Sequence, residues 1–392
     1  MVDLTRYNQT QLLRYYSELS DSEKKLLDSQ LNIIDFDFMN NIYKNSYIDE
    51  EIDLKKISPL KIIDDLYNTQ YFETGKKLVQ NGEYALLLLA GGLGSRLGFN
   101  RSKGCLKLNI NGKKISLFEL YINELKKANK ECNTLIKLYI MASDYNYKDI
   151  INFFEENNYF NYPRKSIKIF VQGKLPILDI NGKLLLKNKN EILFGPNGNG
   201  DVFESLKNNN LINDMKENNI KYVLFSIIDN PLNNLVDYNF IGATIENNYS
   251  LSSKTITKES NEDKDYVFCK YDNKPFMLPS QYISQDISDY KIDDKYVYRE
   301  KNIANHLISI EEIEKFSNVE LKYHRAYKKN SYINDDNILV NPNNPNTFKF
   351  EKYIFDAFNY ADDMLLYRVK KDKYMPIKIR EDIIKIENYF NK

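Results

Sequence analysis

The stretch Tyr84-Ala-Leu-Leu-Leu-Leu-Ala-Gly-Gly-Leu-Gly-Ser-Arg-Leu-Gly98 decides the fold of this chain. Its first seven residues form a continuous apolar run of strand length, and glycines follow at once. Such a run, without polar alternation, is typical of a strand that is buried on both faces, as in a parallel sheet covered by helices on both sides. The stretch therefore predicts a parallel sheet with a glycine-rich loop at the carboxyl end of one strand.

The segments after this loop alternate between helical and strand patterns. This alternation predicts an α/β fold with a doubly wound, mostly parallel sheet, because parallel strands need crossover helices. The helical patterns cover residues 117–129, 147–157 and 202–218, and the strand patterns cover residues 135–141, 167–171 and 222–228.

The chain divides into three parts by pattern. Residues 1–82 are mostly helical in pattern, with Ser20 placed as a helix cap, and they contain no catalytic motif. We expect an N-terminal helical segment over residues 1–82, a catalytic α/β domain over residues 83–370, and a shortened C-terminal segment over residues 371–392.

Two features inside the catalytic part indicate smaller β structures. An Asn-Gly turn between apolar arms predicts a hairpin over residues 178–186. The polar stretch 261–295 has a hairpin-like pattern, so we expect a small accessory sheet there, beside the main one.

Composition narrows the class of protein. The 392 residues include 55 Lys and Arg against 55 Asp and Glu, and dedicated nucleic-acid binders usually carry a basic excess. No apolar run approaches the length of a membrane span, and residues 1–9 lack the apolar core of a signal peptide. Cys105, Cys132 and Cys269 have no metal or disulfide spacing, which favours a reducing compartment. We expect a cytoplasmic protein that binds neither nucleic acid nor membrane.

The glycine-rich segment, residues 91–104, has the features of a phosphate-binding loop. Glycine lets backbone N–H groups approach phosphate oxygens, and Arg96 and Lys103 add positive charge. A Rossmann fingerprint is excluded because Gly98 comes one position too late, and no Walker motif is present. The alternative is a plain glycine-rich turn with exposed basic residues. That alternative does not explain why the segment comes directly after a buried strand.

Residues 89–104, Leu-Ala-Gly-Gly-x-Gly-Ser-Arg-Leu-Gly…Lys-Gly, resemble the signature of eukaryotic UDP-N-acetylglucosamine pyrophosphorylases. The resemblance implies a Rossmann-like fold of the nucleotide-diphospho-sugar transferase type. Two positions depart from the family pattern. Leu93 stands where the family usually has Gln, and Ser102 stands where it usually has Pro. A Leu at the first position is seen in related UDP-sugar and UDP-glucose pyrophosphorylases.

The resemblance implies roles for the loop residues. Ala90, Gly91 and Gly92 are expected to bind the nucleotide. Arg96 and Lys103 are expected to be catalytic and to hold the phosphates that leave as pyrophosphate, because both can cancel negative charge.

Two later motifs imply contacts with the uracil base and the sugar. Phe170-Val-Gln-Gly-Lys-Leu-Pro176 is similar to the family's Gln-Gly-x-Leu-Pro motif, so Gln172 is expected to pair with uracil through its amide. Gly195-Pro-Asn-Gly-Asn-Gly-Asp201 is similar to its Pro-x-Gly-Asn-Gly motif, which implies that Gly198 lies against uracil and Asn199 contacts the sugar. By pattern alone, both segments would be turns.

Asp229 is the predicted metal ligand. It follows the strand pattern 222–228, and a carboxylate at a strand's carboxyl end that faces a triphosphate suits Mg²⁺. The family has Val-Asp-Asn at this point, which implies that Asp229 binds Mg²⁺, with Mn²⁺ as an alternative. A lone Asp in this position would otherwise be interpreted as a turn residue.

The last third of the chain carries three more motifs of the family. Lys301-Asn-Ile-Ala-Asn-His306 implies that Asn302 contacts the sugar, and we interpret His306 as structural because the reaction needs no general base of that kind. The other two motifs are residues 346–356 and 376–378, and in the first of them the resemblance implies that Tyr353 and Phe355 are aromatic residues of the sugar pocket. It also implies that Lys349 and Lys378 are catalytic, with Lys378 on the sugar phosphate. By residue type alone, both lysines would be surface residues.

Two expected sugar-pocket positions depart from the family. Tyr266 falls where the family has a glycine near the N-acetyl group, and Pro279 falls where it has a sugar-binding glutamate. A tyrosine in place of glycine removes space, so the departures bear on which sugar the chain accepts.

Together the motifs predict a Mg²⁺-dependent uridylyltransferase that joins UTP to N-acetylglucosamine 1-phosphate and releases pyrophosphate. One alternative is a UDP-glucose, UDP-galactose or broad-specificity UDP-sugar pyrophosphorylase. An alternative of another class is an inactive homologue that binds a nucleotide sugar and regulates a partner. The residues leave the oligomeric state open.

Overall fold

The computed structural model describes residues 2–46, 52–64, 70–99, 101–258, 266–279 and 282–392. These residues form two compact units, and each unit combines segments that are far apart in the chain. The domain boundaries expected at residues 82 and 370 divide the chain into consecutive segments, and these boundaries stay a prediction. Unit 1 combines Met1–Glu51, Gly173–Asp201 and Glu320–Tyr353, and unit 2 combines Ile52–Gln172, Val202–Val319 and Ile354–Lys392.

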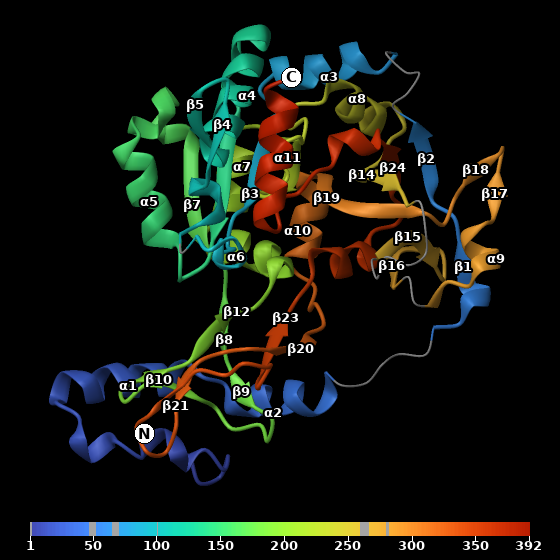
Figure 1. Ribbon diagram of the computed structural model, residues 1–392. Helices are drawn as coiled ribbons and strands as arrows, with labels where there is room; N and C mark the ends of the chain where they lie inside the picture. The colour runs from blue at the N-terminus through green and yellow to red at the C-terminus, as the bar shows by residue number, and fades with distance from the viewer. Residues whose placement is uncertain (1, 47–51, 65–69, 100, 259–265, 280–281) are drawn as a thin grey trace. The chain divides into compact units, whose positions relative to one another are not determined.

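A large sheet forms the centre of unit 2 (Figure 1). Its strands are β1 (Ile57–Ser58), β2 (Lys61–Asp64), β3 (Tyr84–Leu89), β6 (Lys137–Ala142), β7 (Ile167–Val171), β13 (Tyr222–Ile227), β14 (Leu251–Thr257), β15 (Tyr266–Tyr271), β16 (Lys274–Pro279), β19 (Glu300–Ser309) and β24 (Leu365–Arg368). The main strand order is β2-β24-β14-β19-β13-β3-β6-β7. Strands β13, β3, β6 and β7 are mutually parallel, whereas β19 runs antiparallel to β13, β14 and β15. The predicted doubly wound, mostly parallel sheet is confirmed.

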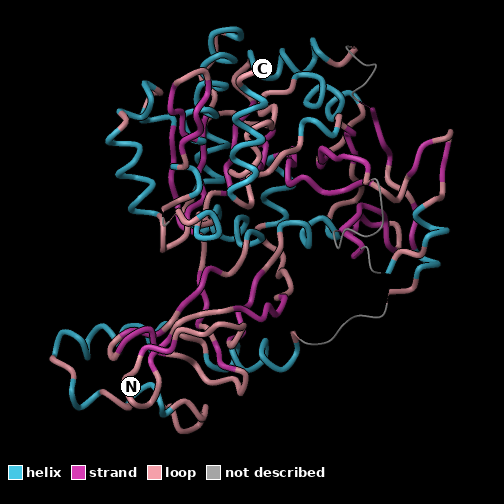
Figure 2. Tube along the Cα trace, viewed as in Figure 1, coloured by secondary structure: helices cyan, strands magenta, loops and turns pink. Residues whose placement is uncertain are grey.

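Helices cover both faces of this sheet, and Figure 2 shows them in cyan around its magenta strands. Every residue of β3 is buried, as its apolar run predicts. Leu86 and Leu88 pack in a core with helices α3, α4 and α8, whereas Phe225 of β13 contacts Phe203 of α6 on the opposite face. The helices of unit 2 are α3 (Phe72–Gln80), α4 (Leu117–Cys132), α5 (Tyr147–Glu156), α6 (Val202–Asn208), α7 (Leu211–Glu217), α8 (Tyr238–Glu246), α9 (Gln285–Ser288), α10 (Ile310–Phe316) and α11 (Arg380–Phe390).

Short hairpins complete unit 2. Strands β4 (Lys107–Ile110) and β5 (Lys113–Ser116) form one of them. In the described part of residues 261–295, where a small accessory sheet was expected beside the main one, two hairpins form, and the first of them belongs to the large sheet. The β15–β16 hairpin joins the large sheet through β1 and β19, and β17 (Lys291–Ile292) pairs separately with β18 (Lys295–Tyr296).

Unit 1 has a core of its own, in which Leu27 and Leu31 pack with Leu186 and Phe350. The predicted cap at Ser20 is confirmed, because its side chain accepts from the Glu23 backbone N–H. The elements of unit 1 are α1 (Asp21–Ile33), α2 (Phe36–Asn45), β8 (Lys174–Pro176), β9 (Leu178–Asp179), β10 (Leu186–Asn188), β11 (Glu191–Ile192), β12 (Phe194–Pro196), β20 (His324–Lys328), β21 (Tyr332–Ile333), β22 (Leu339–Val340) and β23 (Thr347–Glu351).

Three expectations from the sequence were wrong in part. Residues 57–64 are not helical, because β1 and β2 pair with the distant strands β15 and β24. The single helix expected over residues 202–218 is two helices, since Asn210 has a φ of 56° that interrupts helical geometry. The Asn-Gly turn near residue 182 forms, but the arms β9 and β10 pair mainly with other strands.

None of the helices described here is long and apolar enough to cross a membrane.

Candidate active site

Four parallel strands of unit 2 end at one edge of the sheet, and predicted or polar residues follow each of them. Ala90 follows β3, Ser143 follows β6, Gln172 follows β7, and Asp229 lies two residues beyond β13. Ligands of open α/β sheets bind beyond the carboxyl ends of the strands. The fold therefore brings three predicted site residues, Ala90, Gln172 and Asp229, to the edge where a nucleotide would bind.

Buried hydrogen bonds hold the start of the glycine loop. The Asn146 side-chain amide donates to the Ala90 carbonyl at 2.8 Å, and the Ser143 hydroxyl donates to the Gly91 carbonyl at 2.9 Å. Both side chains are fully buried. Sequence reasoning missed Ser143 and Asn146 as loop supports. The available signal was the spacing Ser-x-x-Asn before α5, in which Asn146 Oδ1 accepts from the Ser143 backbone N–H at 2.8 Å.

Gly91 lies against the amide that is expected to recognise uracil. A Cβ on Gly91 would be 3.3 Å from Gln172 Nε2, so a larger residue would press on that amide. The Gln172 side chain is 8% exposed, and its amide forms no hydrogen bond with any residue that the structure describes. An amide held at a sheet edge with free donor and acceptor groups suits recognition of an imide.

The rest of the loop folds back on itself. The Gly94 backbone N–H donates to the Arg101 carbonyl at 3.1 Å, and the Lys103 backbone N–H donates to the Gly92 carbonyl at 3.3 Å. The Ser102 backbone N–H donates to Asp149 Oδ2 at 3.0 Å. Proline, the family's usual residue here, cannot donate this hydrogen bond. The departure at Ser102 therefore adds an anchor between the loop and α5.

The end of the loop meets Asp229 and the C-terminal part of the chain. Lys103 Nζ lies 3.4 Å from Asp229 Oδ2 and donates to the Ile377 carbonyl at 2.9 Å. The Ile377 backbone N–H in turn donates to the Asp229 carbonyl at 2.8 Å. This arrangement places Lys378, the next residue, beside the pair formed by Lys103 and Asp229.

One oxygen of Asp229 suits a metal ion. Asp229 Oδ1 is buried and has no hydrogen-bond partner. Buried carboxylate oxygens without a partner are rare in proteins unless water or an ion binds them. Among the described residues, no cluster of three or more His, Cys, Asp or Glu side chains could hold a metal. Mg²⁺ often binds through one or two carboxylates, with substrate phosphates and water as its other ligands, and Asp229 fits that pattern.

Two predicted cations near this edge are exposed. Arg96 and Lys378 form no side-chain hydrogen bond or ion pair with any described residue. The backbone N–H of Lys378 is held by Asp382 Oδ2 at 2.8 Å, so the backbone is fixed while the ammonium stays available. Both side chains can therefore turn toward phosphate groups.

The predicted sugar residues of unit 2 lie on and near β19. Asn302 pairs with Thr255 of β14, and the register shifts just after it, so that residues 303–305 form a bulge. Bulges near active sites re-aim side chains. Asn302 Oδ1 accepts from the Ala304 backbone N–H at 2.6 Å, which leaves the amide N–H groups of Asn302 for a ligand.

The two sugar-pocket residues that depart from the family pattern, Tyr266 and Pro279, face one another. Tyr266 pairs directly with Pro279 across the β15–β16 hairpin. The Tyr266 ring also packs on Phe355, with ring centroids 4.9 Å apart. Tyr266, Pro279 and Phe355 thus form one apolar wall, which the strand pairing and the ring contact bring together from distant parts of the chain.

Unit 1 carries the other four predicted site residues. Gly198 has a φ of +96°, and a Cβ there would lie 2.2 Å from the Lys352 carbonyl oxygen, so only glycine fits. Asn199 follows it at the start of a 3-10 turn. Lys349 Nζ lies 2.7 Å from Glu351 Oε1, and the Tyr353 ring packs on His324 with centroids 4.5 Å apart.

His306 has the environment of a structural residue. It is fully buried, its Nδ1 lies 2.9 Å from Ser253 Oγ, and its ring packs edge-on against Phe358. Burial lowers the pKa of His306 to about 3, so the ring is neutral at physiological pH. This environment supports the interpretation of His306 as structural.

A doubly wound sheet with a glycine loop, a loop lysine and a carboxylate at its carboxyl edge defines a nucleotidyltransferase of the α/β class. A family model described as UTP--glucose-1-phosphate uridylyltransferase matches residues 35–391. The chain belongs to this family.

Relatives and solved structures agree with this family. The UDP-N-acetylglucosamine pyrophosphorylase of Saccharomyces cerevisiae is 30% identical over 371 residues, covering 91% of this chain and 76% of that protein. The crystal structure of the uridine diphosphate N-acetylglucosamine pyrophosphorylase from Trypanosoma brucei superposes with a TM-score of 0.78 at 25% identity, covering 98% of this chain and 82% of that one. A UDP-glucose phosphorylase structure from Trypanosoma brucei shares the fold, with a TM-score of 0.70 at 16% identity, covering 94% of this chain and 79% of that one.

Proposed function

We propose that this chain makes UDP-N-acetylglucosamine and pyrophosphate from UTP and N-acetylglucosamine 1-phosphate. The observation that carries the proposal is the site at the sheet edge, where Lys103 of the glycine-rich segment contacts Asp229 beyond the end of β13. The choice of sugar rests on the yeast and trypanosome relatives, which are named as UDP-N-acetylglucosamine pyrophosphorylases.

The reaction is an in-line displacement at phosphorus. A phosphate oxygen of the sugar 1-phosphate attacks the α-phosphorus of UTP, and the bond from the α-phosphorus to the bridging oxygen breaks as pyrophosphate leaves. Such a reaction needs little covalent help from the protein, because positioning and cancellation of negative charge lower the barrier. We assign each role from the residues at the edge of the sheet and from the family motifs.

The loop and the base-recognition residues would hold UTP. Gly91 and Gly92 would offer backbone N–H groups to the phosphates, since the Gly92 position has open space around it, and Ala90 would line the nucleotide. The Gln172 amide would pair with uracil, and Gly198 would lie against the base.

The cations would cancel charge in the transition state. Arg96 and Lys103 would hold the β- and γ-phosphates of UTP. Lys378 would hold the sugar phosphate, and Lys349 would support this group of cations. The sugar would contact Asn199, Asn302, Tyr353 and Phe355.

Asp229 would hold Mg²⁺, or Mn²⁺, through its unpartnered oxygen. The ion, when bound, adds positive charge at the departing pyrophosphate. Lys103 keeps the Asp229 carboxylate oriented, because it contacts the other oxygen of the same group.

We also propose a cytoplasmic location. The three cysteines are all buried and free, which fits a reducing compartment. The balance of 55 basic against 55 acidic residues supports small-molecule substrates rather than nucleic acid.

The test is pyrophosphate release from UTP and Mg²⁺, with N-acetylglucosamine 1-phosphate and glucose 1-phosphate in parallel. Preference for the amino sugar is the expected result. Preference for glucose 1-phosphate would keep the reaction and overturn the sugar. UTP binding without pyrophosphate release from either sugar would favour an inactive regulatory homologue instead.

A further inference from the structure

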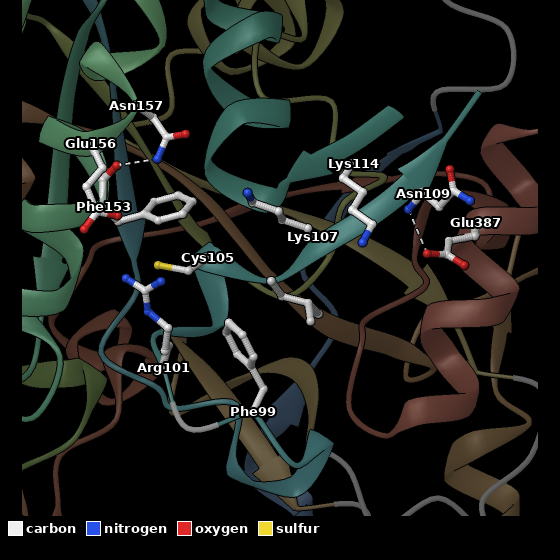
Figure 3. Close-up of a pocket in the computed structure, with 11 residues that line it drawn as sticks. Phe99, Arg101, Cys105, Lys107, Asn109, Lys114, Phe153, Glu156, Asn157 and Glu387 are labelled. Atoms are coloured by element: carbon white, nitrogen blue, oxygen red, sulfur yellow. Dashed lines mark hydrogen bonds between the residues drawn. The ribbon is translucent and has the colours of Figure 1, made fainter. Parts of the chain in front are cut away.

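A pocket of about 510 Å³ lies in unit 2, outside the set of residues assigned to UTP and sugar (Figure 3). Its walls come from the glycine loop, the β4–β5 hairpin, α5 and α11. Its volume is within the range of pockets that bind small organic molecules, roughly 300–1,000 Å³.

The floor of the pocket is apolar. Leu106 and Phe153 line it and are almost fully buried, and Phe99 of the loop adds a second ring. Cys105 also lines the floor, and burial raises the pKa of its thiol to about 12, so that the sulfur stays neutral. A floor with two aromatic rings and a neutral thiol suits a flat apolar group.

The hairpin wall carries unpaired positive charge. Lys107 and Lys114 project from the same face of the β4–β5 hairpin, because Lys114 pairs with Asn109 and Lys107 lies two residues from Asn109. Neither lysine forms a hydrogen bond or ion pair with any residue in the described part of the chain.

Two carboxylates, Glu156 and Glu387, also line the pocket, and neither forms an ion pair with Lys107 or Lys114. The Glu387 carboxylate accepts from the Asn109 backbone N–H at 2.7 Å, as Figure 3 shows. Glu156 lines the pocket from α5 and forms no ion pair with a described residue. Arg101 is paired with Asp149 at 2.7 Å. No described residue holds Lys107 or Lys114 in an ion pair, so the hairpin side of the pocket offers both ammonium groups to an anion.

The pocket also contacts the catalytic loop directly. Phe99 and Arg101 line the pocket, and backbone hydrogen bonds join both to Gly94 inside the loop. The Phe99 N–H donates to the Gly94 carbonyl at 3.1 Å, and the Gly94 N–H donates to the Arg101 carbonyl at 3.1 Å. Helix α11, which supplies Glu387 to the pocket, also supplies Arg380, whose Nε donates to the Leu97 carbonyl at 3.0 Å. An occupant of the pocket would thus press on the segment that carries Arg96 and Lys103.

We propose that this pocket is a regulatory site for a small organic anion with a flat apolar ring, which binds Lys107 and Lys114 and changes the affinity of the glycine loop for UTP. Binding to the pocket is independent of the proposed function, and only the effect on UTP rests on it. Such coupling must be reciprocal, so UTP changes the affinity for the anion by the same factor.

The test uses 8-anilinonaphthalene-1-sulfonate, an aromatic anion that becomes fluorescent in apolar sites, and its uncharged analogue N-phenyl-1-naphthylamine. Both are titrated into the full chain without substrate. The double variant Lys107→Gln/Lys114→Gln is expected to weaken binding of the sulfonate by about tenfold or more, equivalent to about 1.4 kcal/mol, and to leave binding of the uncharged analogue unchanged. The matched control is Lys113→Gln/Lys127→Gln, which removes two exposed lysines that do not line the pocket and is expected to bind both probes like the wild type.

UTP affinity is then measured by calorimetry with and without saturating sulfonate. The expected result is a change in the Kd for UTP that the Lys107→Gln/Lys114→Gln variant loses. Equal sulfonate affinity in all three proteins, or simple displacement of the sulfonate by UTP, would overturn the pocket assignment. An unchanged Kd for UTP would overturn the regulatory role. Absence of UTP binding even without the sulfonate would instead count against the proposed function, while the titrations still decide the pocket.

Discussion

Lys103 Nζ lies 3.4 Å from Asp229 Oδ2, and the same ammonium donates to the Ile377 carbonyl at 2.9 Å. One side chain thereby joins the glycine loop, the end of β13 and the segment before α11. The two charged side chains are 16% and 19% exposed, so the cost of removing both charges from water offsets most of their attraction, and the pair adds little net stability. We infer that its geometry serves the substrates rather than the fold.

Removal of either charge is therefore expected to affect catalysis and not folding. Lys103→Ala and Asp229→Ala should each lower kcat for pyrophosphate release by roughly a hundredfold or more, because each removes a charge contact used in the transition state, at a cost on the order of 3 kcal/mol. Circular dichroism and thermal unfolding should match the wild type. Lys113→Ala, an exposed lysine of β5, is the control. Turnover at the wild-type rate in both variants would refute the assigned roles.

The apolar wall formed by Tyr266, Pro279 and Phe355 is expected to tune sugar selection. Tyr266→Gly opens space beside Phe355, so the ratio of kcat/KM for N-acetylglucosamine 1-phosphate to that for glucose 1-phosphate should rise. The variant should also lose stability of about 0.5–1.5 kcal/mol beyond simple burial, because the ring contact is gone. Tyr266→Phe keeps the ring and should leave the ratio unchanged. An equal ratio in all three proteins would show that this wall does not contact the sugar.

The central strand and its loop could be predicted because their signal is local. The apolar run of β3 and the glycines after it are adjacent in the chain, and Asp229 and Gln172 were placed by the ends of predicted strands. Residues at the ends of parallel neighbouring strands must meet at one edge, so the strand pattern predicted where these residues lie. Their roles came from the family motifs, because by pattern alone both would be turn residues.

The parts that could not be predicted depend on contacts between distant segments. Strand β2 forms only because it pairs with β24, about 300 residues later, and its own residues carry no clear strand pattern. The Ile377 carbonyl that accepts from Lys103 is a backbone group, so the type of residue 377 does not predict this contact. The pairing of Tyr266 with Pro279 likewise depends on the register of a hairpin.

Two glycines of the site are expected to respond differently to the same substitution. Gly198→Ala should lower the free energy of unfolding by about 2–4 kcal/mol even without nucleotide, because the new Cβ meets the Lys352 carbonyl and the φ of +96° disfavours any side chain. Gly92→Ala has open space around it and should leave stability unchanged, but it should weaken UTP binding if phosphate approaches the backbone there. Urea unfolding and calorimetric titration with UTP measure the two effects. Equal stability of the two variants would contradict the structural reason for Gly198.

His306 is expected to set part of the acid sensitivity of the fold. Burial lowers the pKa of His306 to about 3 in the folded chain, below its ordinary value of 6.5. Between these two values the unfolded chain binds more protons at His306 than the folded chain does. The contribution of His306 to the free energy of unfolding is therefore fully present above the ordinary pKa and is lost as the pH falls toward the lower value. This residue alone contributes a slope of about 1.4 kcal/mol per pH unit in that window.

The variant His306→Gln can keep a hydrogen bond to Ser253 and does not titrate, so it should lack this contribution. The free energy of unfolding of both proteins is measured by urea titration from about pH 4 to about pH 8. At the upper end the difference between them reports packing alone, which serves as the internal reference. As the pH falls below the ordinary histidine pKa, the wild type should lose stability faster than the variant, and the difference should shrink or reverse. A difference that stays constant over the whole range would show that His306 is protonated as easily in the folded chain as in the unfolded one.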